Sequence, residues 1–379
     1  MMGTLPLNWV WIKTIPLEVR IKLAKIWIGL LLEKFSRMVT EPRLQEILSR
    51  FSDIKILVVG DFYLDAYWMI DKTRSTLSLE TPWHTSPVVD QRYSPGAAGT
   101  VTNNLNALGV DTVYVVGVIG EDGFGKTLVN HLNENGCTTD FMINSADRVT
   151  PTYLKPIHRG YEDVAVESSR FDIENLVSSS FHLEEQVIEN LNVCIPLVDG
   201  VIIGDQMPHD NLGVITDRVR EEICRLATEF PEKVFYADSR TRIGQYRNLI
   251  IKPNRFEAKR AVEPEWIGED VSIDEVKEIG NTLLSRTGQP LFVTIGPDGI
   301  LVFDSEKISH IPGIFIEGQV DPVGAGDSVS AGLVSSLCCG GSCIEAAFIG
   351  NLVASVTVTK IGKTGTASVD EVIDRFLSL

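Results

Sequence analysis

The pattern best suited to chemistry is a short glycine-rich stretch near the C-terminus, Gly324-Ala325-Gly326-Asp327, which precedes a run of small and apolar residues. Small residues let the chain turn so that its N–H groups converge, and the run behind them is typical of a buried helix, whose N-terminus binds anions. The carboxylate of Asp327 would repel a phosphate that is only bound. It could instead take a proton from a substrate hydroxyl while the N–H groups of 324–327 stabilise a transferring phosphoryl group. The alternative is a glycine-rich turn in which Asp327 merely caps the helix.

A second candidate follows Lys252-Pro253. Asn254 and Glu257 are three residues apart, so at the start of a helix both side chains face one way. An amide oxygen and a carboxylate suit a hydrated Mg²⁺, which takes few protein oxygens together with waters and phosphate oxygens. The same spacing is typical of a capping box. Both interpretations remain open for these four residues alone.

Acidic or polar residues end four of the predicted strands, at Asp61, Asp205, Asp238 and Lys252-Pro253-Asn254. The carboxyl ends of parallel strands line the crevice in which ligands bind, so we expect these residues at one site. For Asp61 we favour a turn or a helix cap. Asp65 lies four residues further on and could point its carboxylate at sugar hydroxyls.

Strands and helices alternate along most of the chain and must position these residues. The predicted strands are residues 54–61, 113–118, 139–143, 200–205, 234–238, 249–251 and 291–294, with hairpins at 152–171 and through 301–303. The predicted helices are residues 41–51, 101–108, 125–135, 184–191, 212–230, 273–286, 328–338 and 344–359. This alternation predicts an α/β fold, a doubly wound and mostly parallel sheet.

Residues 66–95 break the alternation, because they combine β-forming residues with Pro82 and Pro87 and show no helical period. They fit a β excursion from the main sheet or a flap over a site. The small residues of 94–100 come next, before a helix, and allow close approach of a ligand or of another strand.

Composition limits the partners of the chain. Its 379 residues carry 34 basic and 51 acidic side chains, a formal charge of −17, which argues against nucleic acid and against a broad electrostatic membrane surface. A phosphate-bearing substrate therefore needs local cations or a metal. The six cysteines form no Cys-x-x-Cys pair and indicate reduced thiols in a cytoplasmic protein.

Residues 1–50 differ from the rest, because they mix aliphatic and aromatic residues with an excess of basic ones. Glu18, Arg20, Lys22 and Lys25 interrupt the apolar run too often for a transmembrane helix. An amphipathic helix packed on the body or on a second subunit is the favoured interpretation, and a membrane-surface anchor is the alternative.

In order and spacing, these motifs resemble the ribokinase/PfkB family of sugar kinases over about residues 51–379, and most closely its heptose 7-phosphate kinase branch. The family motifs are Gly60-Asp61-Phe62-Tyr63-Leu64-Asp65, Asn254-x-x-Glu257, Val293 to Gly299 and Gly324-Ala325-Gly326-Asp327. The branch is indicated by Gly60 to Trp68, Ser94-Pro95-Gly96, Arg170-Phe171-Asp172 and Lys360-Ile361-Gly362. The resemblance implies a ribokinase-like fold, with helices on both faces of the sheet and a small β lid from about residues 66–95 and 150–171.

The resemblance also implies transfer of the γ-phosphoryl group of ATP, with Mg²⁺, to a sugar or sugar phosphate, and it allows an activating monovalent cation. In that family Asp327 would be the general base and Gly324, Ala325 and Gly326 the anion hole. The residues implied at the acceptor sugar are Asp65, Gly96, Ala97 and Thr100, beside Asp327. Asn254 and Glu257 would organise Mg²⁺, and the residues implied near the nucleotide are Thr294, Gly296, Gly299, Asn351 and Gly362. The lid implies a homodimer.

The sequence departs from the branch in three places, one of them the lid, which carries Glu80, Trp83 and His84. The stretch 96–100 is Gly-Ala-Ala-Gly-Thr where the branch has Gly-Gly-Ala-Ala-Asn, and no lysine-glycine pair follows Asp205. These changes leave the acceptor open, and a nucleoside or other small-alcohol kinase and a non-catalytic ligand-binding relative are the alternatives. Lys155, Arg159 and Arg170 are candidates for holding a phosphate already on the acceptor, although lid residues of this kind are more often solvated.

Overall fold

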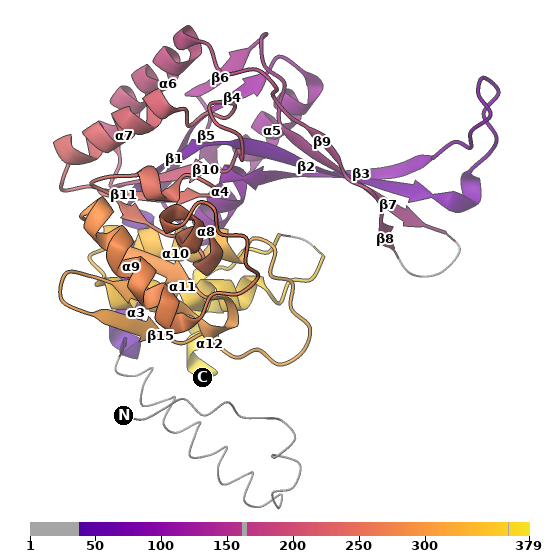
Figure 1. Cartoon of the computed structure of the whole chain (residues 1–379). Coiled ribbons are helices and arrows are strands. Elements are labelled where there is room, and N and C mark those ends of the chain that lie inside the picture. The colour runs from indigo at the N-terminus through magenta and orange to yellow at the C-terminus, as the bar shows by residue number, and fades with distance from the viewer. Residues whose placement is uncertain (1–37, 161–164, 363) are drawn as a thin grey trace, which may run out of the picture.

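The computed structural model describes residues 38–160, 165–362 and 364–379, which form two β-sheets and ten α-helices (Figure 1). The larger sheet has the order β15-β14-β13-β12-β11-β10-β1-β4-β5, with β6 also paired to β4. Its strands are β1 (Lys55–Gly60), β4 (Thr112–Gly120), β5 (Cys137–Thr138), β6 (Met142–Ser145), β10 (Gly200–Asp205), β11 (Val234–Ser239), β12 (Ile250–Ile251), β13 (Leu291–Thr294), β14 (Ile300–Phe303) and β15 (Ile308–Ile311). Only the β13–β14 and β14–β15 pairs of this sheet are antiparallel.

Helices cover both faces of this sheet. One hydrophobic cluster packs beneath α3 (Glu41–Ser49), α4 (Ala98–Ala107), α5 (Gly123–Glu134), α10 (Ala325–Cys338), α11 (Cys343–Thr357) and α12 (Val369–Leu377). The other packs beneath α6 (Phe181–Cys194), α7 (Asp217–Glu229), α8 (Arg255–Val262) and α9 (Ile273–Thr287). Central strands such as β1 are apolar on both faces because both are covered. The predicted doubly wound α/β fold is confirmed.

The smaller sheet extends away from the body (Figure 1). It contains β2 (Phe62–Asp71), β3 (Val88–Ala97), β7 (Thr152–Arg159), β8 (Val166–Glu167) and β9 (Phe171–Ile173). β2 leaves the body directly after β1, and β3 returns to the start of α4. The β excursion expected at 66–95 and the hairpin expected at 152–171 are therefore parts of one sheet, which we call the lid.

Local hydrogen bonds explain where the element predictions are wrong. The helix expected at 212–230 begins at Asp217, because the side chain of Thr216 caps it and Val214 bonds to a distant carboxylate. Of the strand expected at 139–143, only residues 142–143 are extended, in β6, because a turn closed by the bond from the N–H of Met142 to the carbonyl of Thr139 separates β6 from β5. Helix α12 was not predicted, although its first turn holds a capping box between Ser368 and Glu371.

The predicted N-terminal extension falls largely on residues 1–37, which lie outside the described residues. From residue 38 the chain leads into α3, which buries Leu44, Ile47 and Leu48. Arg43 of α3 forms an ion pair of 2.9 Å with Glu345 of α11. Among the helices that the structure describes, none is long and apolar enough to cross a membrane.

Candidate active site

The glycine-rich loop forms the N-terminus of α10. Gly324 is the N-cap, with a φ of 78°, and no side chain caps the helix, so the alternative that Asp327 is a capping residue is wrong. A Cβ on Gly324 would lie 2.7 Å from the Thr364 side chain and 3.4 Å from that of Thr100, which leaves little room for any other residue. The N–H of Ala325 donates to the carbonyl of Pro322 at 3.1 Å, whereas within the described part of the chain the N–H groups of Gly326 and Asp327 have no backbone acceptor. These two N–H groups of the helix start can serve an anion site.

Asp321 ties this loop to the turn at Gly362. Its two carboxylate oxygens accept hydrogen bonds from the N–H groups of Val323, at 3.1 Å, and Gly362, at 3.3 Å. Gly362 has a φ of 73°. The turn expected near the nucleotide is thus linked to the loop expected to hold the phosphoryl group.

Asp327 lies in the first turn of α10 and is half-buried. Burial raises the pKa of its carboxyl group to about 7, and the charge of Asp238 raises it further, while Lys252 and Arg240 oppose the shift. A carboxylate with a near-neutral pKa is suited to accept a proton from a hydroxyl group.

Lys252 was expected at the site only as a polar strand end, and the sequence assigned it no role. Its side chain is 4% exposed, and its Nζ atom lies 2.8 Å from Oδ2 of Asp238. The same Nζ lies 3.6 Å from the point where a Cβ on Gly326 would be, so the ammonium group borders the glycine-rich loop. Burial alone would lower the pKa of Lys252, but the charge and hydrogen bond of Asp238 together with the charges of Tyr236 and Glu257 outweigh it, and the pKa is raised. Its place beside Pro253-Asn254 at a strand end is the one signal that the sequence carried.

Asn254 and Glu257 form a capping box at the start of α8, as the alternative interpretation expected. The Asn254 side chain accepts from the N–H groups of Phe256 and Glu257, and Glu257 accepts from the N–H of Asn254 at 2.8 Å. Burial and the charge of Asp238 raise the pKa of Glu257 to about 7. Across the described residues, no group of three or more His, Cys, Asp or Glu side chains could hold a metal. One carboxylate and one amide fit a Mg²⁺ that takes its other ligands from water and phosphate, and that role stays a prediction.

The turn after β13 lies beside this capping box. The N–H of Thr294 donates to the carbonyl of Pro253 at 3.0 Å, and Thr294 bridges to Asn254. Gly296 and Gly299 have φ values of 67° and 99°, and a Cβ on Gly299 would collide with the carbonyl of Ile311. The structure thus brings the predicted nucleotide residues of this turn together with Asn254.

Asn351 of α11 reaches the same region indirectly. Its side-chain amide donates to the carbonyl of Pro312 at 3.1 Å, and residue 312 packs against Gly299. Asn351 is 8% exposed and supports the segment after β15.

Asp65 and Lys155 form an ion pair within the lid. Oδ1 of Asp65 lies 2.7 Å from Nζ of Lys155, and both side chains are largely buried. Lys155 also donates to the Tyr67 hydroxyl at 3.2 Å, so it is neither solvated nor free to hold a phosphate. A Cβ on Gly96, which pairs across the sheet from Tyr63, would lie 2.7 Å from Oδ2 of Asp65. The lid strand therefore needs glycine at this position to keep the Asp65 carboxylate in place.

The predicted acceptor residues Ala97 and Thr100 lie at the start of α4. Ala97 is the N-cap, with φ 51° and ψ −120°, a conformation that favours glycine. Thr100 is buried and borders Gly324. The acceptor stretch and the glycine-rich loop therefore meet.

Arg240, after β11, lies between the lid and the body. Burial raises the pKa values of Asp327 and Glu257 in the body and of Tyr153 in the lid, and the positive charge of Arg240 opposes each of these rises. Arg170 stacks on Tyr153, with its guanidinium carbon 3.9 Å from the ring centre. Two guanidinium groups thus act on one lid tyrosine.

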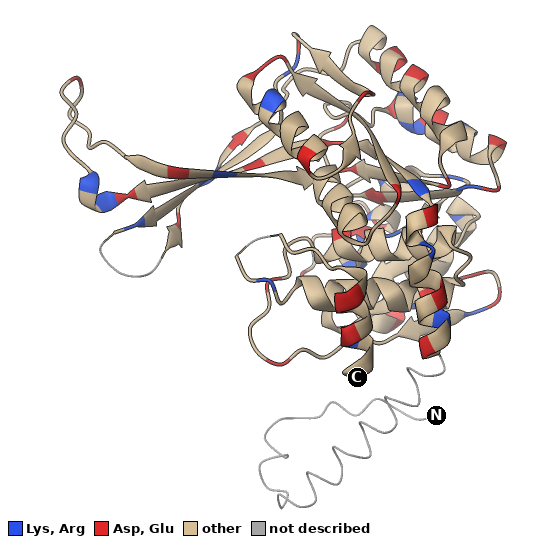
Figure 2. Ribbon diagram, turned by 180° about the vertical axis from the view of Figure 1, so that it is seen from behind, with Lys and Arg blue, Asp and Glu red and all other residues tan. Residues whose placement is uncertain are grey.

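Figure 2 shows that acidic residues outnumber basic ones over the face of the body that it presents.

Comparison with known proteins agrees with this arrangement. The sequence profile of the pfkB family carbohydrate kinases matches residues 65–369. The chain is 32% identical over 331 residues to bifunctional protein HldE of Wolinella succinogenes, covering 86% of this chain and 66% of that protein. The corresponding protein of Pelobacter propionicus is 28% identical, with 87% and 65% covered. The chain thus spans slightly less than two thirds of the length of these relatives.

Solved structures show the same fold. A putative sugar kinase from Clostridium perfringens superimposes with a TM-score of 0.65 at 19% identity, covering 86% of this chain and 96% of that one. Phosphofructokinase-2 from Escherichia coli in complex with potassium gives 0.64 at 15% identity, with 86% and 99% covered. Ribokinase from Arabidopsis thaliana complexed with ribose and ATP gives 0.62 at 17% identity, with 85% and 98% covered.

Proposed function

Because this chain belongs to the pfkB family of carbohydrate kinases, we propose that it transfers the γ-phosphoryl group of ATP to a hydroxyl group of a sugar or sugar phosphate. The observation that carries the proposal is the arrangement at the start of α10. A helix N-terminus, the buried ammonium of Lys252 and a carboxylate with a pKa of about 7 lie together there. These are the three groups that phosphoryl transfer to an alcohol requires.

In the proposed mechanism, the Asp327 carboxylate takes the proton of the acceptor hydroxyl as its oxygen bonds to the γ-phosphorus. The bond to the bridging oxygen breaks, and ADP leaves with the electron pair. The N–H groups of 324–326 and the ammonium of Lys252 stabilise the charge on the transferring group. Asn254 and Glu257 would hold Mg²⁺, which supplies positive charge to the polyphosphate when it is bound.

For the acceptor we propose a sugar phosphate of the heptose 7-phosphate type, from the likeness to the HldE proteins. The support on this chain is the pair of guanidinium groups, Arg170 and Arg240, that act on Tyr153. Arginine recognises phosphate oxygens through its planar set of donors. The Nε and Nη2 atoms of Arg170 already donate to Asp172 at 2.6 and 2.7 Å, so Arg170 would bind a phosphate through its other N–H groups.

We also propose that the chain forms a homodimer through the lid and acts in the cytoplasm. The lid and the segment between β2 and β3 expose large apolar side chains, which a second lid could cover. They are Leu77, Leu79, Trp83, Val89, Val166 and Phe171. All six cysteines are free, as in a reducing compartment.

The test is ADP release by the purified protein with Mg-ATP and a panel of heptose 7-phosphate, fructose 6-phosphate, ribose and inosine. Turnover with a sugar or sugar phosphate supports the proposal, turnover with inosine alone supports a nucleoside kinase, and no turnover on any acceptor contradicts both. Asp327→Asn should lose nearly all turnover while still binding ATP. A variant that kept most of the wild-type rate would show that Asp327 is not the base.

A further inference from the structure

Asp61 is a buried carboxylate that the proposed mechanism does not use. It follows β1 and is 3% exposed. Its Oδ2 accepts the N–H groups of Gln206 and Met207, both at 2.8 Å, and its Oδ1 accepts the N–H of Val214 at 2.7 Å. The prediction of a turn or helix cap is wrong, because all three donors belong to a loop more than a hundred residues away. Asp61 fixes both ends of the segment 206–214 at once.

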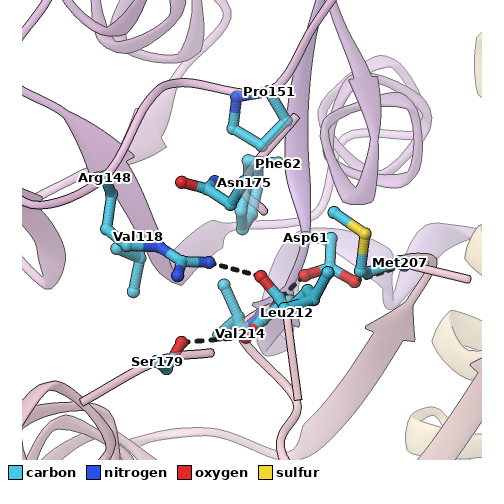
Figure 3. A pocket seen from close by; sticks show the side chains of 11 residues that line it. Asp61, Phe62, Val118, Arg148, Pro151, Asn175, Ser179, Met207, Leu212 and Val214 are labelled. Atoms are coloured by element: carbon cyan, nitrogen blue, oxygen red, sulfur yellow. Dashed lines mark hydrogen bonds between the residues drawn. The ribbon is translucent and has the colours of Figure 1, made fainter. Parts of the chain in front are cut away.

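The close approach of this loop is built into its sequence. A Cβ on Gly213 would lie 2.5 Å from Oδ1 of Asp61, so only glycine allows Val214 to reach the carboxylate. From the opposite side the guanidinium of Arg148 donates to the carbonyls of Val177, at 2.6 Å, and Leu212. Figure 3 shows Asp61 and Arg148 reaching the same part of the loop from two segments.

A small cavity lies among these side chains, but it does not fit a sugar. Its volume is about 10 Å³, close to that of a single water probe. Asp61 therefore acts on the loop and not by binding an acceptor itself.

The first two residues of the 206–214 segment contact different parts of the site: Met207 faces the lid, and Gln206 faces Asp238 and Arg240. The hydroxyl of Tyr63 lies 3.8 Å from the sulfur of Met207, and the Tyr63 ring packs against Tyr153 of the lid, 4.9 Å between centres. The Gln206 side chain lies 3.4 Å from the carbonyl of Asp238 and 3.4 Å from the guanidinium of Arg240. The 206–214 segment thus lies between the lid and the charged groups beside the glycine-rich loop at 324–327.

We propose that Asp61 is a positioning residue that fixes Gln206 and Met207 against the lid, and that it thereby governs binding of the acceptor and not the chemistry or the nucleotide. This inference rests on the proposed function. Asn at position 61 can still accept from Gln206 and Met207 through its oxygen. Its NH₂ group then meets the Val214 N–H, donor against donor, so the far end of the loop is released.

The test compares Asp61→Asn and Gly213→Ala with the wild type, varying heptose 7-phosphate and Mg-ATP separately. If heptose 7-phosphate is not turned over by the wild type, the panel acceptor that is turned over replaces it. We expect the KM for the acceptor to rise roughly tenfold or more in both variants, as for loss of a hydrogen bond to a charged group, with kcat and the KM for ATP within about twofold. Gly213→Ala reaches the same contact without changing a charge, so it keeps the test valid if Asp61→Asn does not fold.

The matched control is Asp122→Asn. Asp122 also joins two segments by accepting backbone N–H groups, from Gly125 and Thr150, each at 2.8 Å, but it does not touch the 206–214 loop. It should lower Tm and leave the acceptor KM unchanged. The inference is wrong, and the proposed function still stands, if the folded Asp61 and Gly213 variants keep the wild-type KM for the acceptor. The same holds if their KM for ATP rises as much as their KM for the acceptor. Absence of any wild-type turnover overturns the proposed function, and the inference with it.

Discussion

Lys252 pairs with Asp238 beside the glycine-rich loop, so its replacement should change both kcat and the stability of the fold. We expect a second substitution, at Asp238, to restore the stability but not kcat. Replacing Lys252 by Met removes the buried ammonium that borders Gly326. If this group stabilises the transferring phosphoryl group, its loss should cost about 2.7–4 kcal/mol of transition-state energy, a decrease in kcat of roughly 10²–10³-fold. ATP binding should weaken much less, because the charge develops in the transition state.

The same substitution also leaves the Asp238 carboxylate, whose side chain is only 15% exposed, without its partner. Breaking a buried ion pair in this way costs about 3–5 kcal/mol of unfolding free energy, so Tm should fall. In the double variant Lys252→Met/Asp238→Asn the side chain that lost its partner is neutral, and most of the stability should return. The rate should not return, because the donor is still absent.

The pH profile gives a third readout of the same variants. The charge of Lys252 lowers the pKa of Asp327, and the charge of Asp238 raises it. The acid limb of kcat/KM should therefore move to higher pH in Lys252→Met and move back toward about 7 in the double variant.

The matched control is Lys259→Met, which removes another largely buried lysine, paired with Glu263 at 2.8 Å on α8. It should lower Tm and leave kcat and the pH profile unchanged. The measurements are steady-state ADP release and thermal unfolding for all four proteins. Recovery of both Tm and kcat in the double variant would refute the reasoning, because Lys252 would then serve only to neutralise Asp238.

Three further predictions follow from the geometry. First, kcat/KM of the wild type should fall below pH about 7, where Asp327 and Glu257 both take up protons. Asp327→Asn should raise Tm at pH 8 but not near pH 4. The folded-state pKa of Asp327 is raised to about 7, so its ionisation destabilises the fold only above the ordinary carboxyl pKa. An equal Tm change at both pH values would contradict this. Second, Ala97→Gly should stabilise the protein by about 1 kcal/mol in thermal or urea unfolding, because φ is 51° at this residue, and a loss of stability would show that Ala97 tolerates this conformation. Third, Gly96→Ala should raise the acceptor KM by displacing the Asp65 carboxylate. Gly123→Ala is the control for a general effect of added methyl groups, because its Cβ would meet no atom within 4 Å and its φ is not positive.

Much of the body could be predicted from the sequence, because its central strands are continuous apolar runs. The predicted strands 200–205 and 291–294 match β10 and β13 residue for residue, since both strands are buried by helices and end at polar residues. The helix expected at 212–230 failed in its first turn, because Val214 is held by Asp61, and no local pattern reports a bond across 153 positions.

The site was predictable to the extent that it lies in local motifs. The glycine-rich loop, the capping box at Asn254 and the turn at Gly299 are each contained within a few residues. Lys252 was expected at the site as a polar strand end, but its role was not predicted, because only the fold places Asp238 and Gly326 beside it. The ion pair of Asp65 with Lys155 joins strands far apart in the chain, so the sequence indicated each residue but not their bond.

The charges around the glycine-rich loop explain how an acidic protein can bind a polyphosphate. The charge of Asp238 acts on the carboxyl groups of both Asp327 and Glu257, and the cations that act on these two groups are Lys252 and Arg240. Three carboxylates against two cations leave no positive excess for a nucleotide, in a chain of net charge −17. The pKa values of about 7 at Asp327 and Glu257 follow from this crowding and from burial. A nucleotide should therefore bind best with a divalent cation that carries the missing positive charge, and binding of free ATP should improve as pH falls through 7 and these carboxylates take up protons.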